Sequence, residues 1–116
     1  MLKLQHKNLK VWKKSILLVQ LIYDVTKEFP IDEKFGLTNQ MRRSSVSISS
    51  NISEGAARKH LKDRTRFYEI ARSSLVELDT QIEIACELNF LNREHLDELS
   101  ELLNANFALL SSMVNH

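Results

Sequence analysis

Residues that interrupt helices are rare in this chain. Its 116 residues include two glycines and one proline. Because both residue types break helices or form turns, their scarcity favours long helices joined by short connections. A chain of this length predicts one domain around one hydrophobic core. Hydrophobic residues make up 43% and charged residues 27% of the chain, which is typical of a soluble globular protein.

Cysteines and long apolar runs are also scarce. The single cysteine, Cys86, excludes an intramolecular disulfide and fits a reducing compartment, so we expect a cytoplasmic protein. The first apolar run, Ile16–Tyr23, is interrupted by Gln20 and is too short to span a bilayer. No cleavage site of small residues follows this run. We therefore expect neither a targeting segment nor contact with a membrane.

The usual signatures of an enzyme are absent. The four histidines are scattered, and none is spaced from a carboxylate or from the cysteine as in a metal site. Two glycines cannot build the usual phosphate-binding loop. Glu54 and Arg58 lie four residues apart, and such an ion pair on a helix is more often structural than catalytic. We expect no catalytic residues, no metal and no cofactor.

Charge is divided along the chain although the formal net charge is only +1. Residues 1–41 hold seven lysines and four acidic residues (net +3), and residues 42–72 hold eight basic and three acidic residues (net +5). Residues 73–116 hold one arginine and eight acidic residues (net −7), so the three parts add to +1. Such a division indicates either a polyanion-binding surface or complementary packing of basic and acidic elements.

Hydrophobic periodicity predicts four helices. Apolar residues recur at steps of three and four over residues 9–29, 37–60, 63–88 and 92–115. Pro30 ends the first segment, Asn89 suits the left-handed residue that often follows a helix, and Asn92 is a good N-cap. Four helices with short connections predict an all-α, antiparallel up-down-up-down bundle, with residues 1–116 forming a single domain.

The first predicted helix is apolar nearly all round. Trp12, Ile16, Val19, Ile22 and Tyr23 form the stripe that we expect to face the core. Further apolar residues fall off this stripe: Leu17, Leu18, Leu21 and Val25. The fourth predicted helix adds its own surplus: Leu102, Ala105, Phe107, Ala108 and Leu109. A helix that is apolar all round is normally buried all round. We therefore expect the surplus residues to be buried between subunits of an oligomer.

The stretch QMRRSSVSISSNISEGAARKH, residues 40–60, fits two secondary structures. Its alternating Val46, Ile48 and Ile52 match a half-buried strand, but nothing else in the chain offers a partner strand. At about 100° per residue it forms a sorted helix instead. Three faces result: a core face (Leu37, Met41, Ser45, Ile48, Ile52, Gly55, Ala56), a small face (Ser49, Ser53, Ala57) and a polar stripe (Gln40, Arg43, Ser47, Asn51, Glu54, Arg58).

Each polar face of this helix has a structural and a functional interpretation. Serine and asparagine are mediocre helix formers, and Gly55 costs about 1 kcal/mol relative to alanine. We therefore expect the small face to permit close approach of another helix. The polar stripe is either a hydrogen-bond network that holds the bundle or a subunit contact together, or a ligand-binding surface.

A long motif in the same region resembles a known family. It comprises Phe29-Pro30, Glu33, Phe35-Gly36-Leu37, Gln40, Arg42-Arg43, Ser47-Ile48, Asn51-Ile52, Glu54-Gly55 and Arg58, and it continues through Phe67, Ala71, Ser74-Leu75 and Glu77-Leu78. In these residues the chain resembles the 23S rRNA intervening-sequence proteins, small bacterial proteins that are sometimes labelled ribosomal-protein-like. Ser45 and Ser53 stand where that family often has alanine, and Asn89 where it often has glycine.

The resemblance implies a four-helix bundle that assembles as a homopentamer, with no well-defined biochemical function for the family as a whole. A related group, the accessory proteins of diversity-generating retroelements, comprises basic pentameric bundles that associate with nucleic acid and a reverse transcriptase. "Ribosomal protein" in this family describes genomic context and not a role in the ribosomal subunit.

Two functions from different classes remain open. The first is binding of RNA or DNA, because basic side chains bind phosphates by charge without a base-reading motif. The candidates are Arg42, Arg43, Arg58, Lys59, Lys62, Arg64 and Arg66. The second is a protein-interaction scaffold or accessory subunit, in which the acidic third and fourth helices complement a larger basic partner. The net charge of +1 is far from the strongly basic balance of most nucleic-acid-binding modules.

Overall fold

Four α-helices make up most of the computed structural model, which describes residues 1–115. Their bounds are α1 Lys10–Thr26, α2 Leu37–Ala56, α3 Leu61–Glu87 and α4 Leu96–Val114, with short 3-10 turns at Gln5–Asn8, Ile31–Glu33 and Arg93–His95. No strand is present within residues 1–115. The predicted all-α fold is confirmed, and the strand interpretation of residues 40–60 is excluded.

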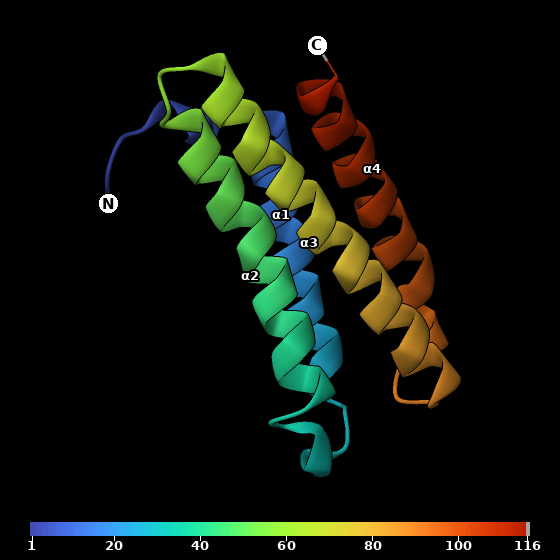
Figure 1. Ribbon diagram of the computed structural model, residues 1–116. Coiled ribbons are helices and arrows are strands. Elements are labelled where there is room, and N and C mark those ends of the chain that lie inside the picture. Colours follow the sequence, from blue (N-terminus) through green and yellow to red (C-terminus); the bar gives the residue numbers. More distant parts are fainter. Residues whose placement is uncertain (116) are drawn as a thin grey trace.

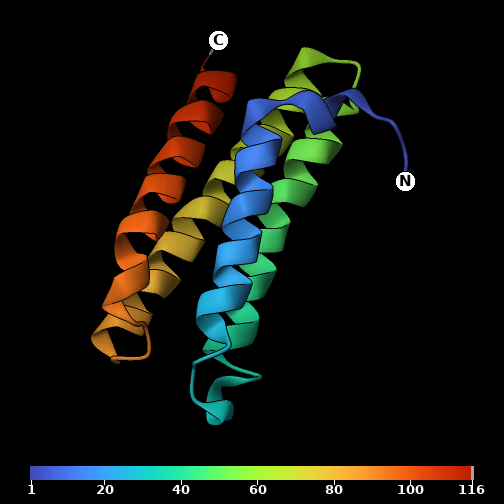
Figure 2. The ribbon, with the colours of Figure 1, turned by 180° about the vertical axis from the view of Figure 1, so that it is seen from behind.

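The helices form an antiparallel up-down-up-down bundle (Figures 1 and 2). Helix α1 packs against α2 and α4, and α3 packs against the same two helices, with α2–α3 as the most extensive contact. Figure 2, seen from behind, shows α1 between α2 and α4. The N-terminal segment lies at the end of the bundle where α2 turns into α3, with Leu4 and His6 close to Ala57 and Arg64.

The helix boundaries differ from the predicted ones by up to four residues. Helix α2 ends at Ala56 and not at His60, where the backbone is already extended (φ −90°, ψ 134°). Helix α4 begins at Leu96 because residues 93–95 form a 3-10 turn. Asn92, predicted as the N-cap of the fourth helix, caps this turn instead, since its side-chain oxygen accepts a hydrogen bond of 3.1 Å from the Glu94 amide.

The buried face of α1 is not the predicted one. Its buried side chains are Val11, Ser15, Leu18, Leu21, Ile22, Val25 and Thr26. The predicted stripe is wrong at Ile16 and Val19, which are only half-buried, and at Tyr23, which is exposed. The observed buried stripe has regular helical spacing. The prediction missed it because two of its positions, Ser15 and Thr26, carry hydroxyl groups, and the prediction considered apolar residues only.

This rotation of α1 also changes the interpretation of its surplus apolar residues. Leu18, Leu21 and Val25 lie in the core of their own bundle, so the expectation that they are buried between subunits is wrong. Of the surplus set on α1, Leu17 stays 50% exposed. The apolar surplus of this helix is therefore a weak indication of an oligomer.

The end of α3 is a Schellman motif centred on Asn89. This residue adopts the predicted left-handed conformation, with φ 59°. The Phe90 amide donates to the Ala85 carbonyl at 2.9 Å, and the Asn89 amide donates to the Cys86 carbonyl at 3.0 Å. These two bonds satisfy carbonyls at the helix end. The turn also places the Phe90 ring 5.7 Å from that of Phe29, which closes the opposite end of the bundle from the α2–α3 turn.

Candidate nucleic-acid interface on the second and third helices

The core face of α2 is buried as predicted. Met41, Ile48 and Ile52 have no exposed surface, Leu37 is nearly buried, and Ser45 is buried among them. The Ser45 hydroxyl donates to the Arg42 carbonyl at 2.8 Å, so its burial leaves no unpaired donor. The helix is thus fixed in rotation, and this fixes where the two polar faces lie.

The small face of α2 contacts α1 through hydrogen bonds. The Ser15 and Ser49 hydroxyls are 2.8 Å apart, and the Trp12 indole nitrogen donates to the Ser53 hydroxyl at 3.1 Å. Short side chains at these positions let the two helices approach closely enough for direct hydroxyl–hydroxyl contact. The expectation that the small face serves helix packing is confirmed at Ser49 and Ser53.

At Gly55, α3 packs closely against α2. A Cβ atom at this position would lie 2.7 Å from Tyr68 Cε1 and 3.1 Å from Phe67 Cβ. Both distances are shorter than an ordinary carbon–carbon contact of about 3.5–4.0 Å. Only glycine therefore allows these two aromatic side chains to pack over α2 just before the turn.

The middle of the polar stripe is used within the bundle. The Ser47 hydroxyl lies 2.9 Å from the Ser74 hydroxyl of α3. The Asn51 amide nitrogen donates to the Ser47 carbonyl at 2.8 Å and to its hydroxyl at 3.1 Å. Both Ser47 and Asn51 are half-buried. Ser47 joins α2 to α3, and Asn51 bonds to Ser47 from within α2. The middle of the stripe is therefore part of a hydrogen-bond network that holds the bundle together.

The ends of the stripe are exposed to solvent. Gln40 and Arg43 lie with Glu77 along a shallow groove between α2 and α3, with a volume of about 420 Å³. At the other end, Arg58 forms an ion pair of 3.2 Å with Glu54. The stripe therefore runs on the outer surface of the α2–α3 pair, with only its middle drawn into the helix contact.

Two of the seven basic candidates bond to the ends of helices. The Arg42 guanidinium donates to the Thr26 hydroxyl at 2.9 Å and lies 4.6 Å above the Tyr23 ring, at the end of α1. Arg64 donates to the Arg58 carbonyl at 2.8 Å and to the Ala56 carbonyl at 3.3 Å, at the end of α2. Cations at helix C-termini also stabilise the helix dipole. These arginines thus have structural partners already.

The remaining candidates fall into two places. Arg58, Lys59, Lys62 and Arg66 are exposed around the α2–α3 turn. Arg43 is also exposed but lies 15 residues before Arg58, which is about 22 Å along a helix of 1.5 Å rise per residue. The structure therefore gathers the basic candidates around the turn and leaves Arg43 apart from them.

An aromatic ring at this turn belongs to the same cluster, although the sequence gives it a different role. Phe67 lies with its ring centroid 4.7 Å from the Arg58 guanidinium carbon and 5.7 Å from that of Arg66. The helical pattern predicts Phe67 only as a member of the core stripe of the third helix, and it is half-buried. Nine residues and a turn separate it from Arg58, so sequence spacing gives no signal for the contact.

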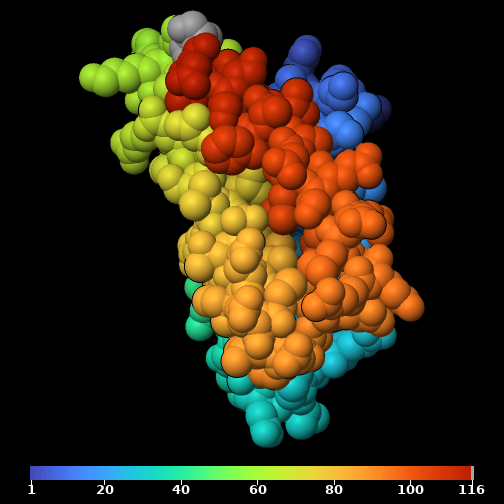
Figure 3. Space-filling model, turned by 90° about the vertical axis from the view of Figure 1, so that its right-hand side faces the viewer, coloured from blue at the N-terminus to red at the C-terminus, as the bar shows by residue number. Residues whose placement is uncertain are grey.

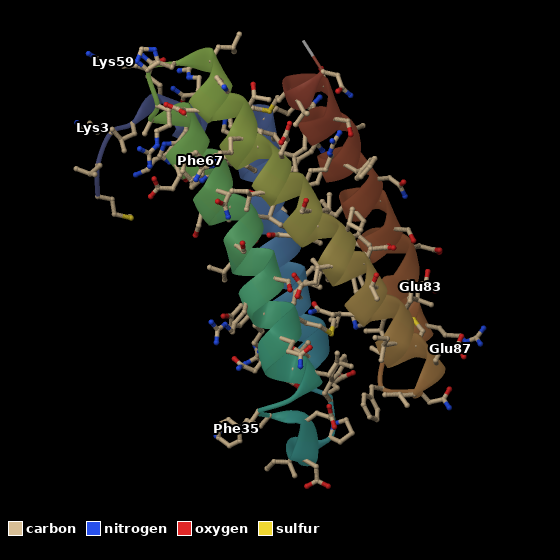
Figure 4. The ribbon with its side chains drawn as sticks, viewed as in Figure 1. Lys3, Phe35, Lys59, Phe67, Glu83 and Glu87 are labelled. Carbon is tan, nitrogen blue, oxygen red and sulfur yellow. The ribbon has the colours of Figure 1, made fainter. Side chains whose placement is uncertain are left out.

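Acidic side chains occupy the opposite end of α3. Figure 4 shows Lys59 and Phe67 near the α2–α3 turn, and Glu83 and Glu87 at the far end of the same helix. Burial raises the pKa of the Cys86 thiol, and the carboxylates of Glu83 and Glu87 raise it further, while Arg93 lowers it. The basic and acidic parts of the sequence therefore lie towards different ends of the bundle, with basic side chains at the α2–α3 turn and acidic side chains at the far end of α3 (Figure 4).

The described part of the chain adds two further facts about its chemistry. Residues 1–115 hold no group of three or more His, Cys, Asp or Glu side chains placed to bind a metal ion. Within the same residues, every helix is too short or too polar to cross a bilayer.

Comparison with known proteins places the chain in a family. The family model described as 23S rRNA-intervening sequence protein matches residues 7–112. The chain belongs to this family. Among solved structures, it is similar to a protein of unknown function from the S23 ribosomal protein family of Bacteroides thetaiotaomicron, at 22% identity and a TM-score of 0.80. That match covers 91% of this chain and 99% of the other.

Membership in the 23S rRNA-intervening sequence family confirms the resemblance seen in the motif of residues 29–58. A likeness at 22% identity supports the four-helix fold and carries no function with it. The comparison with curated proteins found no match. The function must therefore be argued from the surface of this chain.

Proposed function

We propose that this chain is a non-enzymatic protein that binds RNA or DNA through the basic side chains of the α2–α3 turn. The cluster of exposed cations carries the proposal. Between residues 54 and 66 the chain holds five Lys and Arg residues against Glu54 and Asp63, a net charge of +3 (5 − 2). The side-chain ammonium groups of Lys59 and Lys62 have no hydrogen bond or ion pair among the residues that the structure describes.

Free cations on a convex turn suit phosphate binding. Phosphate contacts need positive charge and counterion release, and they need no groove for base edges. Several acidic residues that offset the overall charge lie elsewhere, as Glu83 and Glu87 do at the far end of α3 (Figure 4). A net charge of +1 is therefore compatible with a local site for a polyanion.

Removal of the free lysines tests the proposal. We expect Lys59→Gln combined with Lys62→Gln to weaken binding of labelled RNA or DNA, measured by fluorescence anisotropy. The slope of log affinity against log salt should fall by roughly 1.4–1.8, because each lysine that no longer binds a phosphate lowers it by about 0.7–0.9. The matched control, Lys27→Gln with Arg93→Gln, removes the same charge from two exposed residues at the other end of the bundle. An unchanged slope in the first variant would refute this site.

Self-association is the second part of the proposal, with copies of this chain joined as the pentamer that the resemblance implies. Two large apolar side chains support it: Ile31 is 85% and Phe35 86% exposed. The connection that carries them is held by hydrogen bonds from the Leu37 amide to Glu33 Oε1 (3.1 Å) and from the Gly36 amide to the Glu33 carbonyl (3.0 Å). Figure 3 shows this connection protruding beyond α3 and α4.

Burial of these two side chains against a second copy would remove a costly exposure, since one phenylalanine buries about 150–250 Å². In sedimentation velocity, Ile31→Ser combined with Phe35→Ser should shift the protein towards smaller species. The control Leu61→Ser removes an apolar side chain that is 60% exposed near the opposite end of the bundle. An assembly that is unaffected by the double variant would exclude this contact.

The alternative function is a scaffold that docks a larger basic protein, and the separated acidic end of α3 favours it. For a scaffold, Glu83→Gln with Glu87→Gln should abolish capture of the partner, while Lys59→Gln with Lys62→Gln should leave it intact. If the chain instead binds nucleic acid, the lysine variant should lose binding and the glutamate variant should retain it. We propose that the protein is cytoplasmic, because a single cysteine suits a reducing compartment. Either function is compatible with that compartment.

A further inference from the structure

Phe67 and Arg58 form a cation–π contact at the α2–α3 turn. The guanidinium carbon of Arg58 lies 4.7 Å from the centroid of the Phe67 ring. The same guanidinium donates to Glu54 Oε2 at 3.2 Å, which holds it from its edge. Ring and carboxylate together fix the orientation of this arginine before any ligand arrives.

Part of this side chain remains accessible to a ligand. The Phe67 ring lies against the guanidinium, yet 46% of the Arg58 side chain is exposed. A guanidinium is planar and weakly hydrated, so it accepts another flat group more readily than an ammonium does. Fixing the plane in advance also lowers the entropy lost when a ligand stacks on it.

Nucleobases are the flat groups that this turn is placed to receive. Lys59 and Lys62 are exposed in the same turn, close to Arg58 in the sequence, and can contact the phosphates of a strand whose base lies on the pair. Bases stack on aromatic rings and on arginine planes in proteins that bind single strands. In a duplex both faces of each internal base are covered by its neighbours, so a duplex cannot use this platform without unstacking.

We propose that the Arg58–Phe67 pair is a platform for an unpaired base, and that the ligand is single-stranded RNA or DNA. This inference rests on the proposed nucleic-acid binding and names its ligand class. Arg58 supplies the stacking surface, Phe67 and Glu54 position it, and the lysines hold the backbone. The acidic partner of Arg58 does not oppose binding here, because the guanidinium acts through its face and the phosphates lie against Lys59 and Lys62.

The test compares single strands with duplexes of the same sequence. Fluorescence anisotropy is measured with labelled oligonucleotides of about 20 nucleotides, longer than the usual site on one binding domain, as RNA and as DNA. Arg58→Lys keeps the charge and removes the plane, and Phe67→Leu keeps an apolar side chain and removes the ring. Arg93→Lys is the matched control, because Arg93 is exposed at the acidic end of the bundle. Thermal unfolding verifies that each variant is folded.

We expect the wild type to bind single strands more tightly than duplexes. Arg58→Lys should weaken single-strand binding about ten-fold with an unchanged salt slope, and Phe67→Leu should do the same. Arg93→Lys should bind as the wild type does. Equal affinity for single strands and duplexes would refute the base-stacking platform but not nucleic-acid binding. Single-strand binding that Arg58→Lys leaves unchanged would have the same consequence. Failure to bind any oligonucleotide at low salt would overturn both proposals.

Discussion

Gly55→Ala is the most informative single change in the packing of this bundle. Alanine in a helix is favoured over glycine by about 0.5–1 kcal/mol, so propensity alone predicts a more stable protein. The structure predicts the opposite. The added Cβ would lie 2.7 Å from Tyr68 Cε1 and 3.0 Å from Tyr68 Cδ1, and Tyr68 is only 8% exposed.

The size of the loss follows from these two effects. Overpacking in a well-packed core costs about 1–3 kcal/mol. We expect a value near the upper end, because Phe67 Cβ lies 3.1 Å away on the same side and limits the movement of α3. After the gain in propensity is subtracted, Gly55→Ala should destabilise the protein by about 2 kcal/mol.

Urea unfolding followed by circular dichroism measures this change, with all proteins at one concentration because self-association would shift the midpoint. Ser50→Ala is the control, since Ser50 is exposed on α2 and should show only the small gain in helix propensity. Adding Tyr68→Ala should relieve the overlap, so that the double variant is more stable than the sum of the single effects predicts. A more stable Gly55→Ala protein would refute the close-approach argument.

Three further predictions concern single contacts. Ser15→Ala should cost about 1–2 kcal/mol in urea unfolding, because the buried Ser49 hydroxyl loses its partner at 2.8 Å; a neutral effect would contradict this. Asn89→Ala should cost about 1 kcal/mol while Asn89→Gly is at least as stable as the wild type, because φ is 59°; equal stability of the two variants would contradict the strain. Alkylation of Cys86 should need a higher pH than that of a free thiol, because burial and then the nearby carboxylates raise its pKa; Glu87→Gln should shift the rate profile to lower pH, and an unshifted profile would exclude the charge effect.

Much of the bundle follows from the sequence because the signals involved are local. Pro30 and the Asn89–Asn92 turn separate the helices at nearly the right residues. The core face of α2 emerges from its periodicity, because serines at the other positions leave only one apolar face. The same method fails for α1, where apolar residues surround the helix and hydroxyls at Ser15 and Thr26 mark the buried side.

The candidate site was only partly predictable. Basic residues near the end of the second helix indicate a turn rich in positive charge, and the structure brings Arg58, Lys59 and Lys62 together there. Sequence alone does not show that Arg42 and Arg64 bond to helix ends, since their acceptors are carbonyl and hydroxyl oxygens of other segments. The Phe67 contact depends on how closely α3 crosses Gly55, which is a property of the packed pair.

Native mass spectrometry of the protein purified at low salt tests whether this chain is an oligomer that binds nucleic acid. We expect a homo-oligomer that carries nucleic acid, with the added mass lost after nuclease treatment and reduced in the Lys59→Gln, Lys62→Gln variant. The control with Lys27→Gln and Arg93→Gln should retain it. A monomer free of nucleic acid that also fails to take up added single strands would contradict the account.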